Sequence, residues 1–202
     1  MIRSLHYLKA MGYDFSPQNF SKLDRLDDFK TLRDKIATCT LCNFSKTRKK
    51  ILMEERLKPC KLFILDTHAS QNENESGILL QSKKGKFLFN SLEKILNLSR
   101  DEFYFSYIFK CFSANKNDDF ALHSCLPFLL NEIKLIKPKI LLCLGEYALK
   151  ALGFSNFKAL KGELFAYEDF FILASFDGEF LERNPSFKEE FFNDLKKLKG
   201  FL

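Results

Sequence analysis

The feature that most limits the fold of this chain is a series of short apolar runs that alternate with segments of helical periodicity. The runs span residues 61–66, 103–109, 139–144 and 170–175. Short runs that are apolar throughout are typical of parallel strands buried on both faces, and the helices between them supply the crossover connections. The sequence therefore predicts an α/β fold, a three-layer α/β/α sandwich around a central four-stranded parallel sheet.

In such a sheet, functional residues gather in the loops that follow the carboxyl ends of the strands. The loops predicted here begin at Asp66, Lys110, Gly145 and Ser175. Helices are expected over residues 3–12, 23–38, 85–98, 123–136, 146–153 and 187–198.

The chain is predicted to fold as one domain with a small addition at its start. Its 202 residues suit a single hydrophobic core. We expect an N-terminal helical arm over residues 1–30 and the domain over residues 31–202. The second helix would end just before Cys39, and the fourth would carry Cys125 in its first turn.

Four of the six cysteines form a ligand-like pattern, Cys39-x2-Cys42 followed by Cys111-x13-Cys125. Two thiolates separated by two residues can grip one metal, and a second pair can close a tetrahedral cage if the fold brings it near. All-cysteine cages of this kind hold structural zinc or a [4Fe–4S] cluster. Spacing alone leaves open a redox CxxC pair or a set of unrelated buried thiols.

The net charge of +6 and the pI near 8.9 permit an anionic partner without requiring one. No apolar run approaches the roughly 20 residues of a membrane span, and residues 1–11 mix charged with apolar side chains, unlike a signal peptide. We expect a cytoplasmic monomer without a membrane partner, in a compartment where thiols stay free to bind metal.

Several motifs, in this order, resemble those of the iron–sulfur uracil-DNA glycosylases, family 4 of the uracil-DNA glycosylase superfamily. They are Cys39-Thr-Leu-Cys42 with Arg48, Lys110-Cys111, Cys125-Leu-Pro, Ile136-Lys-Pro-Lys139, Leu144-Gly145 and Arg183-Asn-Pro-Ser-Phe-Lys188. The resemblance covers about residues 31–198. It implies a uracil-DNA glycosylase-like domain, DNA as partner, and a [4Fe–4S] cluster, in preference to zinc, held by Cys39, Cys42, Cys111 and Cys125.

Such glycosylases flip a nucleotide out of the duplex and hydrolyse its glycosidic bond. The resemblance implies a carboxylate that orients water, an aromatic platform, an amide that reads the base, and a donor to uracil O2. The matched positions in this chain are Thr67, with Asp66 one residue earlier, then Leu80, Tyr107 and Asp177.

Asp66 and Asp177 are thus the candidate catalytic residues, and Tyr107 and Leu80 the candidate base-pocket residues. Each aspartate is also a residue type favoured at caps and turns. A carboxylate facing uracil O2 opposes the negative charge of the leaving base. We therefore expect standard uracil excision to be lost or changed.

Three polar positions are expected to contact nucleic acid if the resemblance extends to the DNA side. Lys86 belongs to a basic cluster, and Arg183 and Asn184 match the last motif of the family. Lysines of this kind contact phosphates, although charge clusters are often only solvated faces.

Three hypotheses follow for the function. The first is an iron–sulfur, DNA-binding protein of base-excision repair that lacks standard uracil excision. The second is an active DNA glycosylase that hydrolyses the N-glycosidic bond of uracil or another damaged base with rearranged catalytic residues. The third is a metal-stabilised interaction protein with no role on DNA.

Overall fold

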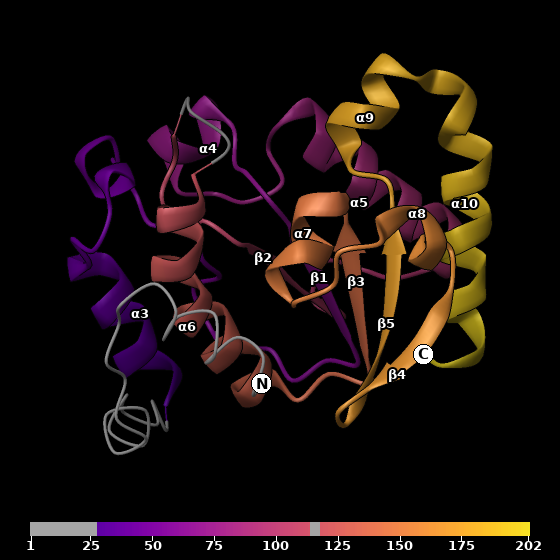
Figure 1. Cartoon of the computed structure of the whole chain (residues 1–202), viewed down its shortest axis with the longest axis horizontal. Coiled ribbons are helices and arrows are strands. Elements are labelled where there is room, and N and C mark those ends of the chain that lie inside the picture. Colours follow the sequence, from indigo (N-terminus) through magenta and orange to yellow (C-terminus); the bar gives the residue numbers. More distant parts are fainter. Residues whose placement is uncertain (1–27, 114–117) are drawn as a thin grey trace.

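A computed structural model describes residues 28–113 and 118–202. At its centre is a five-stranded sheet in the order β2-β1-β3-β5-β4 (Figure 1). The strands are β1 (Leu62–Asp66), β2 (Phe103–Tyr107), β3 (Ile140–Leu144), β4 (Leu164–Tyr167) and β5 (Phe170–Ser175). The first three and β5 run parallel, whereas β4 pairs antiparallel with β5 at the edge.

The predicted α/β architecture is confirmed, with one strand more than expected. The additional strand, β4, is only partly buried at the edge of the sheet, and its apolar run of four residues is too short to predict a strand. The second strand is also shorter than predicted and ends at Tyr107 instead of Phe109.

Eight helices accompany the sheet within the described residues. They are α3 (Phe29–Thr38), α4 (Gln71–Ser76), α5 (Lys83–Leu96), α6 (Asp119–Ile136), α7 (Glu146–Ala151), α8 (Phe157–Leu160), α9 (Gly178–Arg183) and α10 (Lys188–Lys197). Short 3-10 turns cover Asn43–Lys46, Pro185–Phe187 and Leu198–Gly200.

The start of α6 differs from the prediction because an earlier residue caps the helix. Asp118 accepts a hydrogen bond from the backbone N–H of Ala121, at 2.9 Å. The helix therefore begins at Asp119 instead of His123, and Cys125 lies in its second turn instead of its first.

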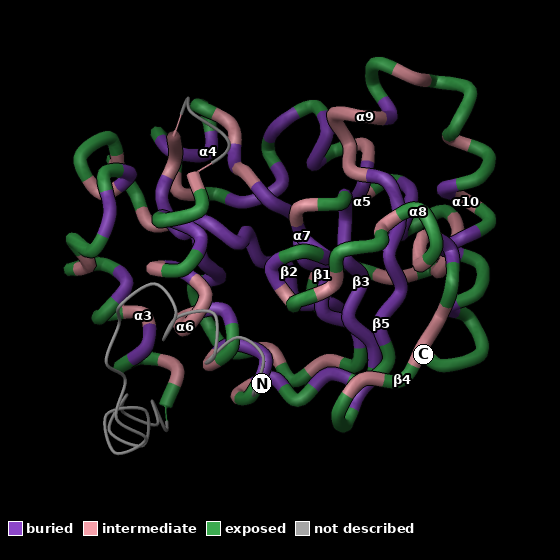
Figure 2. The backbone as a smooth tube through the Cα atoms, viewed as in Figure 1, coloured by how far each residue is buried: buried purple, intermediate pink, exposed green. Residues whose placement is uncertain are grey.

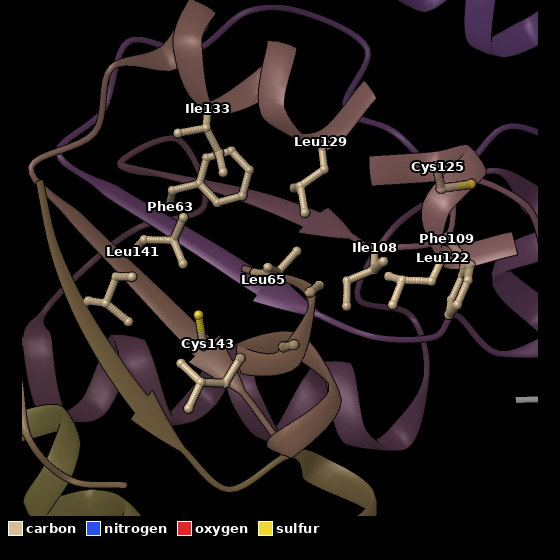
Figure 3. Close-up of a cluster of buried hydrophobic side chains, with 14 of the residues drawn as sticks. Phe63, Leu65, Ile108, Phe109, Leu122, Cys125, Leu129, Ile133, Leu141 and Cys143 are labelled. Atoms are coloured by element: carbon tan, nitrogen blue, oxygen red, sulfur yellow. The ribbon is translucent and has the colours of Figure 1, made fainter. Parts of the chain in front are cut away.

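Two apolar layers form the core, one on each face of the sheet. Phe63 and Leu65 belong to the layer beneath α6, whereas Leu62 and Ile64, the alternate residues of the same strand, belong to the layer beneath α5 and α10. Figure 3 shows the first layer, and in Figure 2 the strands β1, β2 and β3 are buried along their whole length.

A third, smaller core lies under α3. Leu32 and Ile36 of this helix pack with Met53, and α3 lies against α6 (Figure 1). The helix begins at Phe29 because Asp28 caps it, accepting from the N–H of Thr31 at 2.8 Å. The predicted helix over residues 3–12, and most of the predicted arm over residues 1–30, fall outside the described residues.

No helix of the described ranges is long and apolar enough to cross a membrane.

Candidate active site and cysteine cluster

The carboxyl edge of the parallel sheet brings together three of the candidate residues. Asp66 and Tyr107 are paired partners at the ends of β1 and β2. Asp177 follows β5 by two residues, and its charge acts on Asp66. Parallel topology causes this convergence, since the carboxyl ends of all four parallel strands lie at one edge.

Asp66 is buried, with 5% of its surface exposed, and it forms an ion pair with Lys84. The Lys84 Nζ lies 3.0 Å from Asp66 Oδ2, and the N–H of Thr67 donates to Oδ1 at 2.6 Å. Burial raises the pKa of Asp66 even though Lys84 favours the charged carboxylate.

Lys84 is a member of this site that the sequence did not single out. Its ammonium also donates to the carbonyl of His68 at 2.5 Å and lies 3.9 Å from Glu179. Burial by itself would lower the pKa of Lys84, but the pairing with Asp66 raises it overall. Lys84 lies in the first turn of α5, which Ser82 caps by accepting from the N–H of Gly85 at 3.1 Å.

Gly178 permits the close approach of α9 to this lysine. A Cβ atom at position 178 would lie 2.6 Å from the Cβ of Lys84, which is too close for any side chain. Asp177 caps the same helix by accepting from the N–H of Phe180 at 2.8 Å. The cap at Asp177 and the Gly178 contact therefore fix α9 against the start of α5.

Tyr107 is fully buried, and its hydroxyl donates to Glu73 Oε1 at 2.9 Å. Burial raises the pKa of Tyr107 well above its ordinary value. Glu73 closes a capping box with Ser70 at the start of α4, a short helix inside the loop predicted to begin at Asp66. The Ser-x-x-Glu signature of such a box was the available signal for Glu73.

Leu80 lies beside these groups and is nearly buried, with 7% of its surface exposed. Its backbone has a φ of 64°, a conformation that leucine seldom adopts. A Cβ on Gly85 would lie 2.6 Å from the Leu80 Cα, so only glycine allows the first turn of α5 to approach this backbone.

The candidate DNA-contacting residues lie outside this buried set. Lys86 is exposed on α5. Arg183 is exposed at the end of α9 and donates to the Glu179 carbonyl at 3.3 Å, and Asn184 donates to the Phe180 carbonyl at 3.0 Å.

The four cysteines of the pattern come from two distant stretches of chain that meet beside α6. Cys125 donates a hydrogen bond to Cys42, which lowers the pKa of Cys42 to about 6 and raises that of Cys125. The charges of Cys39 and Cys42 act on Cys111, and that of Cys111 acts on Cys125. The sulfurs are therefore neighbours, but no group of three or more His, Cys, Asp or Glu side chains among the described residues has the arrangement of a metal site.

Hydrogen-bond donors surround these sulfurs. The backbone N–H groups of Phe44 and Ser45 favour the thiolate of Cys42, and the N–H of Lys110 favours that of Cys125. The guanidinium of Arg48 lies 3.6 Å from the sulfur of Cys111. Donors aimed at sulfur stabilise thiolates, the form in which cysteine binds metal.

The other two cysteines lie apart from this group. Cys143 is fully buried within β3, away from Cys125 in Figure 3, and burial raises the pKa of its thiol. Burial also raises the pKa of the half-buried Cys60, to about 11. Both are therefore held as neutral thiols, in keeping with their place outside the pattern.

Comparisons with known proteins point to one family. The profile of the uracil DNA glycosylase superfamily matches residues 55–196. A type-4 uracil-DNA glycosylase of Sulfurisphaera tokodaii is 21% identical over 86% of this chain and 84% of its own length. Type-4 uracil-DNA glycosylases of Saccharolobus solfataricus and Pyrobaculum aerophilum are each 26% identical, over 61% and 62% of this chain and 58% and 64% of their own lengths.

Proposed function

Because the chain belongs to the uracil DNA glycosylase superfamily, we propose that it is an iron–sulfur protein that binds DNA in base-excision repair and lacks standard uracil excision. If it does act on a base, the reaction is that of a DNA glycosylase, the activity named for its relatives.

The observation that carries the proposal is the internal pairing of the groups at the base-binding positions. Asp66 pairs with Lys84, and Tyr107 is bonded to Glu73. These four side chains are each no more than 9% exposed. A base could enter only by displacing groups that already satisfy one another, and each displaced polar group would remain buried without a partner.

The charges at the site also oppose the chemistry of uracil release. The departing uracil is an anion, so a working site places hydrogen-bond donors near its O2. Asp177 stands at the position matched to that donor, and Asp66 and Glu179 add two more carboxylates nearby. Lys84 brings a positive charge to this group, but it is already paired with Asp66.

For the metal centre, the donor chemistry fits a [4Fe–4S] cluster, with zinc as the alternative. Cys39, Cys42, Cys111 and Cys125 would hold it, since these sulfurs are neighbours and hydrogen-bond donors face them. A bound cluster would supply a structural cross-link between the Cys39–Cys42 segment and the start of α6. Nothing in the surrounding residues requires it to transfer electrons.

DNA contact is proposed for the exposed face around the start of α5 and the end of α9. Lys86 and Arg183 supply positive charge there, and Asn184 supplies a polar side chain beside them. The acidic groups of α9 offset this charge in part, because Glu182 lies 3.5 Å from Lys83. We therefore expect binding to be weak and sensitive to salt.

The test is a single-turnover assay of anaerobically purified protein on oligonucleotides that carry uracil, hypoxanthine or xanthine, in single and double strands. The proposal expects no excision of uracil, together with DNA binding that weakens as salt rises. Lys86→Glu should weaken binding further, whereas Lys94→Glu, on the same helix but in its last turn, serves as the matched control. Uracil excision by the unaltered protein would overturn the proposal.

A second candidate function, an active glycosylase with rearranged residues, is favoured by the similarity to three type-4 uracil-DNA glycosylases and by the place of Asp66 at the end of β1. Excision of any lesion in the panel that disappears in Asp66→Asn would support it. DNA binding that is absent, or that does not respond to salt, would instead favour an interaction protein without a role on DNA.

A further inference from the structure

A buried ion pair lies directly beside the cysteines and has no place in the base-binding site. Lys110 precedes Cys111, and its ammonium pairs with Glu132 of α6. Both residues are almost fully buried, at 1% and 0% exposure. A lysine and a glutamate seldom lie this deep in a protein unless they are paired.

The pair is part of a hydrogen-bond network that leaves neither charge unsatisfied. Lys110 Nζ also donates to Ser106 Oγ and, at 2.7 Å, to the carbonyl of Tyr107. Ser106 donates to Glu132 Oε2 and Tyr104 donates to Oε1, each at 2.9 Å. The network joins the end of β2 to the middle of α6.

The backbone of Lys110 is held as firmly as its side chain. Its carbonyl accepts from the N–H of Leu52 at 2.9 Å, and its own N–H faces the sulfur of Cys125. The residue is therefore fixed at its ammonium, its carbonyl and its amide, and Cys111 follows it directly in the chain.

The spacing between Glu132 and Cys125 along α6 connects the ion pair to the position of the cysteines. Glu132 lies seven residues after Cys125, about two helical turns or 10 Å along the axis and on the same face. The Lys110–Glu132 contact thus fixes where along the axis of α6 the loop that carries Cys111 lies. It thereby fixes the distance between Cys111 and Cys125.

We propose that Lys110 and Glu132 are positioning residues of the cysteine centre, which hold Cys111 in register with Cys125. This inference rests on the proposed centre and deepens it. A buried ion pair adds little stability compared with apolar residues of similar size, whereas it can enforce one arrangement of the chain. A role in register accounts for charges at two core positions where apolar side chains would serve stability equally well.

The test compares variants reconstituted with iron and sulfide without oxygen. Lys110→Met alone leaves Glu132 buried and unpaired and can fail to fold, so the informative variant is the double change Lys110→Met with Glu132→Leu. It removes both charges, and the metal-free double variant should unfold at a temperature close to that of the unaltered protein. The cluster should nevertheless be lost to a chelator about 10-fold faster or more, because supporting contacts around metal ligands have effects of that size.

The matched control is a contact between a buried carboxylate and an exposed lysine on the opposite face of the sheet. Asp194 accepts from Ser175 at 2.7 Å and lies 3.4 Å from Lys197. The double change Asp194→Leu with Lys197→Met should leave the rate of cluster loss unchanged, whatever it does to stability. Lys110→Arg, which keeps the charge, should lose the cluster more slowly than the double variant Lys110→Met with Glu132→Leu.

Two outcomes overturn the inference and are distinguishable. If the unaltered protein takes up iron and the Lys110→Met, Glu132→Leu variant holds it equally long, the pair has no positioning role although the cysteine centre stands. If the unaltered protein takes up no iron, the proposed centre itself fails, and this inference fails with it.

Discussion

At the scale of single residues, the pairing of Lys84 with Asp66 is the contact with the largest consequences. It joins the end of β1 to the start of α5 in a place where water does not reach either group. Replacing one partner leaves the other charged, buried and alone.

Lys84→Met should therefore lower the free energy of unfolding by about 3–5 kcal/mol, the usual cost of breaking a buried ion pair from one side. Urea denaturation followed by circular dichroism measures the change. The double variant Lys84→Met with Asp66→Asn should recover most of the loss. Equal instability of the single and double variants would show that the lysine acts by packing alone.

The same pair predicts a dependence on alkaline pH. Pairing with Asp66 raises the pKa of Lys84 above its ordinary 10.5 despite the opposing effect of burial, so the folded state holds this proton more tightly than the unfolded state. The resulting stability is fully present below pH 10.5 and is lost as the pH rises through the folded-state value. Urea denaturation at neutral pH and above pH 10.5 should show a steeper loss for the unaltered protein than for the double variant; parallel losses would contradict the assignment.

At the scale of elements, α9 is the segment whose position depends most on one glycine. The Cβ of an alanine at position 178 would lie 2.6 Å from the Cβ of Lys84. The helix would have to move away from α5, and the Lys84–Glu179 and Lys83–Glu182 contacts would weaken with it.

Gly178→Ala should cost about 1–3 kcal/mol, the range for overpacking a closed contact. It should also expose the Lys84 region, which limited proteolysis can detect as faster cleavage near α9. Gly200→Ala is the control, because a Cβ there would meet no atom within 4 Å. Equal behaviour of the two variants would show that α9 adapts to the extra methyl group.

The elements also show what could be predicted from the sequence. The four parallel strands were recognisable because each is apolar on both faces, and they place Asp66, Tyr107 and Asp177 at one edge by topology alone. The edge strand β4 was missed because it is short and only partly buried. The helix α6 begins at Asp119, four residues before the predicted start at His123, because Asp118 caps it.

The partners of the site residues could not be predicted from the sequence, for a different reason. Lys84 stands among Lys83 and Lys86, and only the fold shows that it points inward while Lys86 is exposed. The pairs Tyr107–Glu73 and Lys110–Glu132 join residues 34 and 22 positions apart. Periodicity and motif order describe local segments, whereas these contacts arise from tertiary packing.

At the scale of the whole molecule, the proposed centre would join segments that lie far apart in the sequence. Its four cysteines come from the segment after α3, the loop after β2 and the second turn of α6. Removal of the metal with a chelator under reducing conditions should lower the thermal midpoint of unfolding. Replacing Cys143, which lies outside the group, with Ala should leave that metal-dependent difference intact; an unchanged midpoint after chelation would argue against a structural centre.

The small core beneath α3 has a consequence for how such a centre would be assembled and lost. Among the described residues, only Leu32, Ile36 and Met53 are buried there, far fewer than in either main layer. A segment with so small a core opens locally more easily than the sheet. The amides of α3 should therefore exchange with deuterium faster than those of the strands, and the same local opening would expose Cys39 and Cys42, which follow this helix, to metal ions and to oxygen.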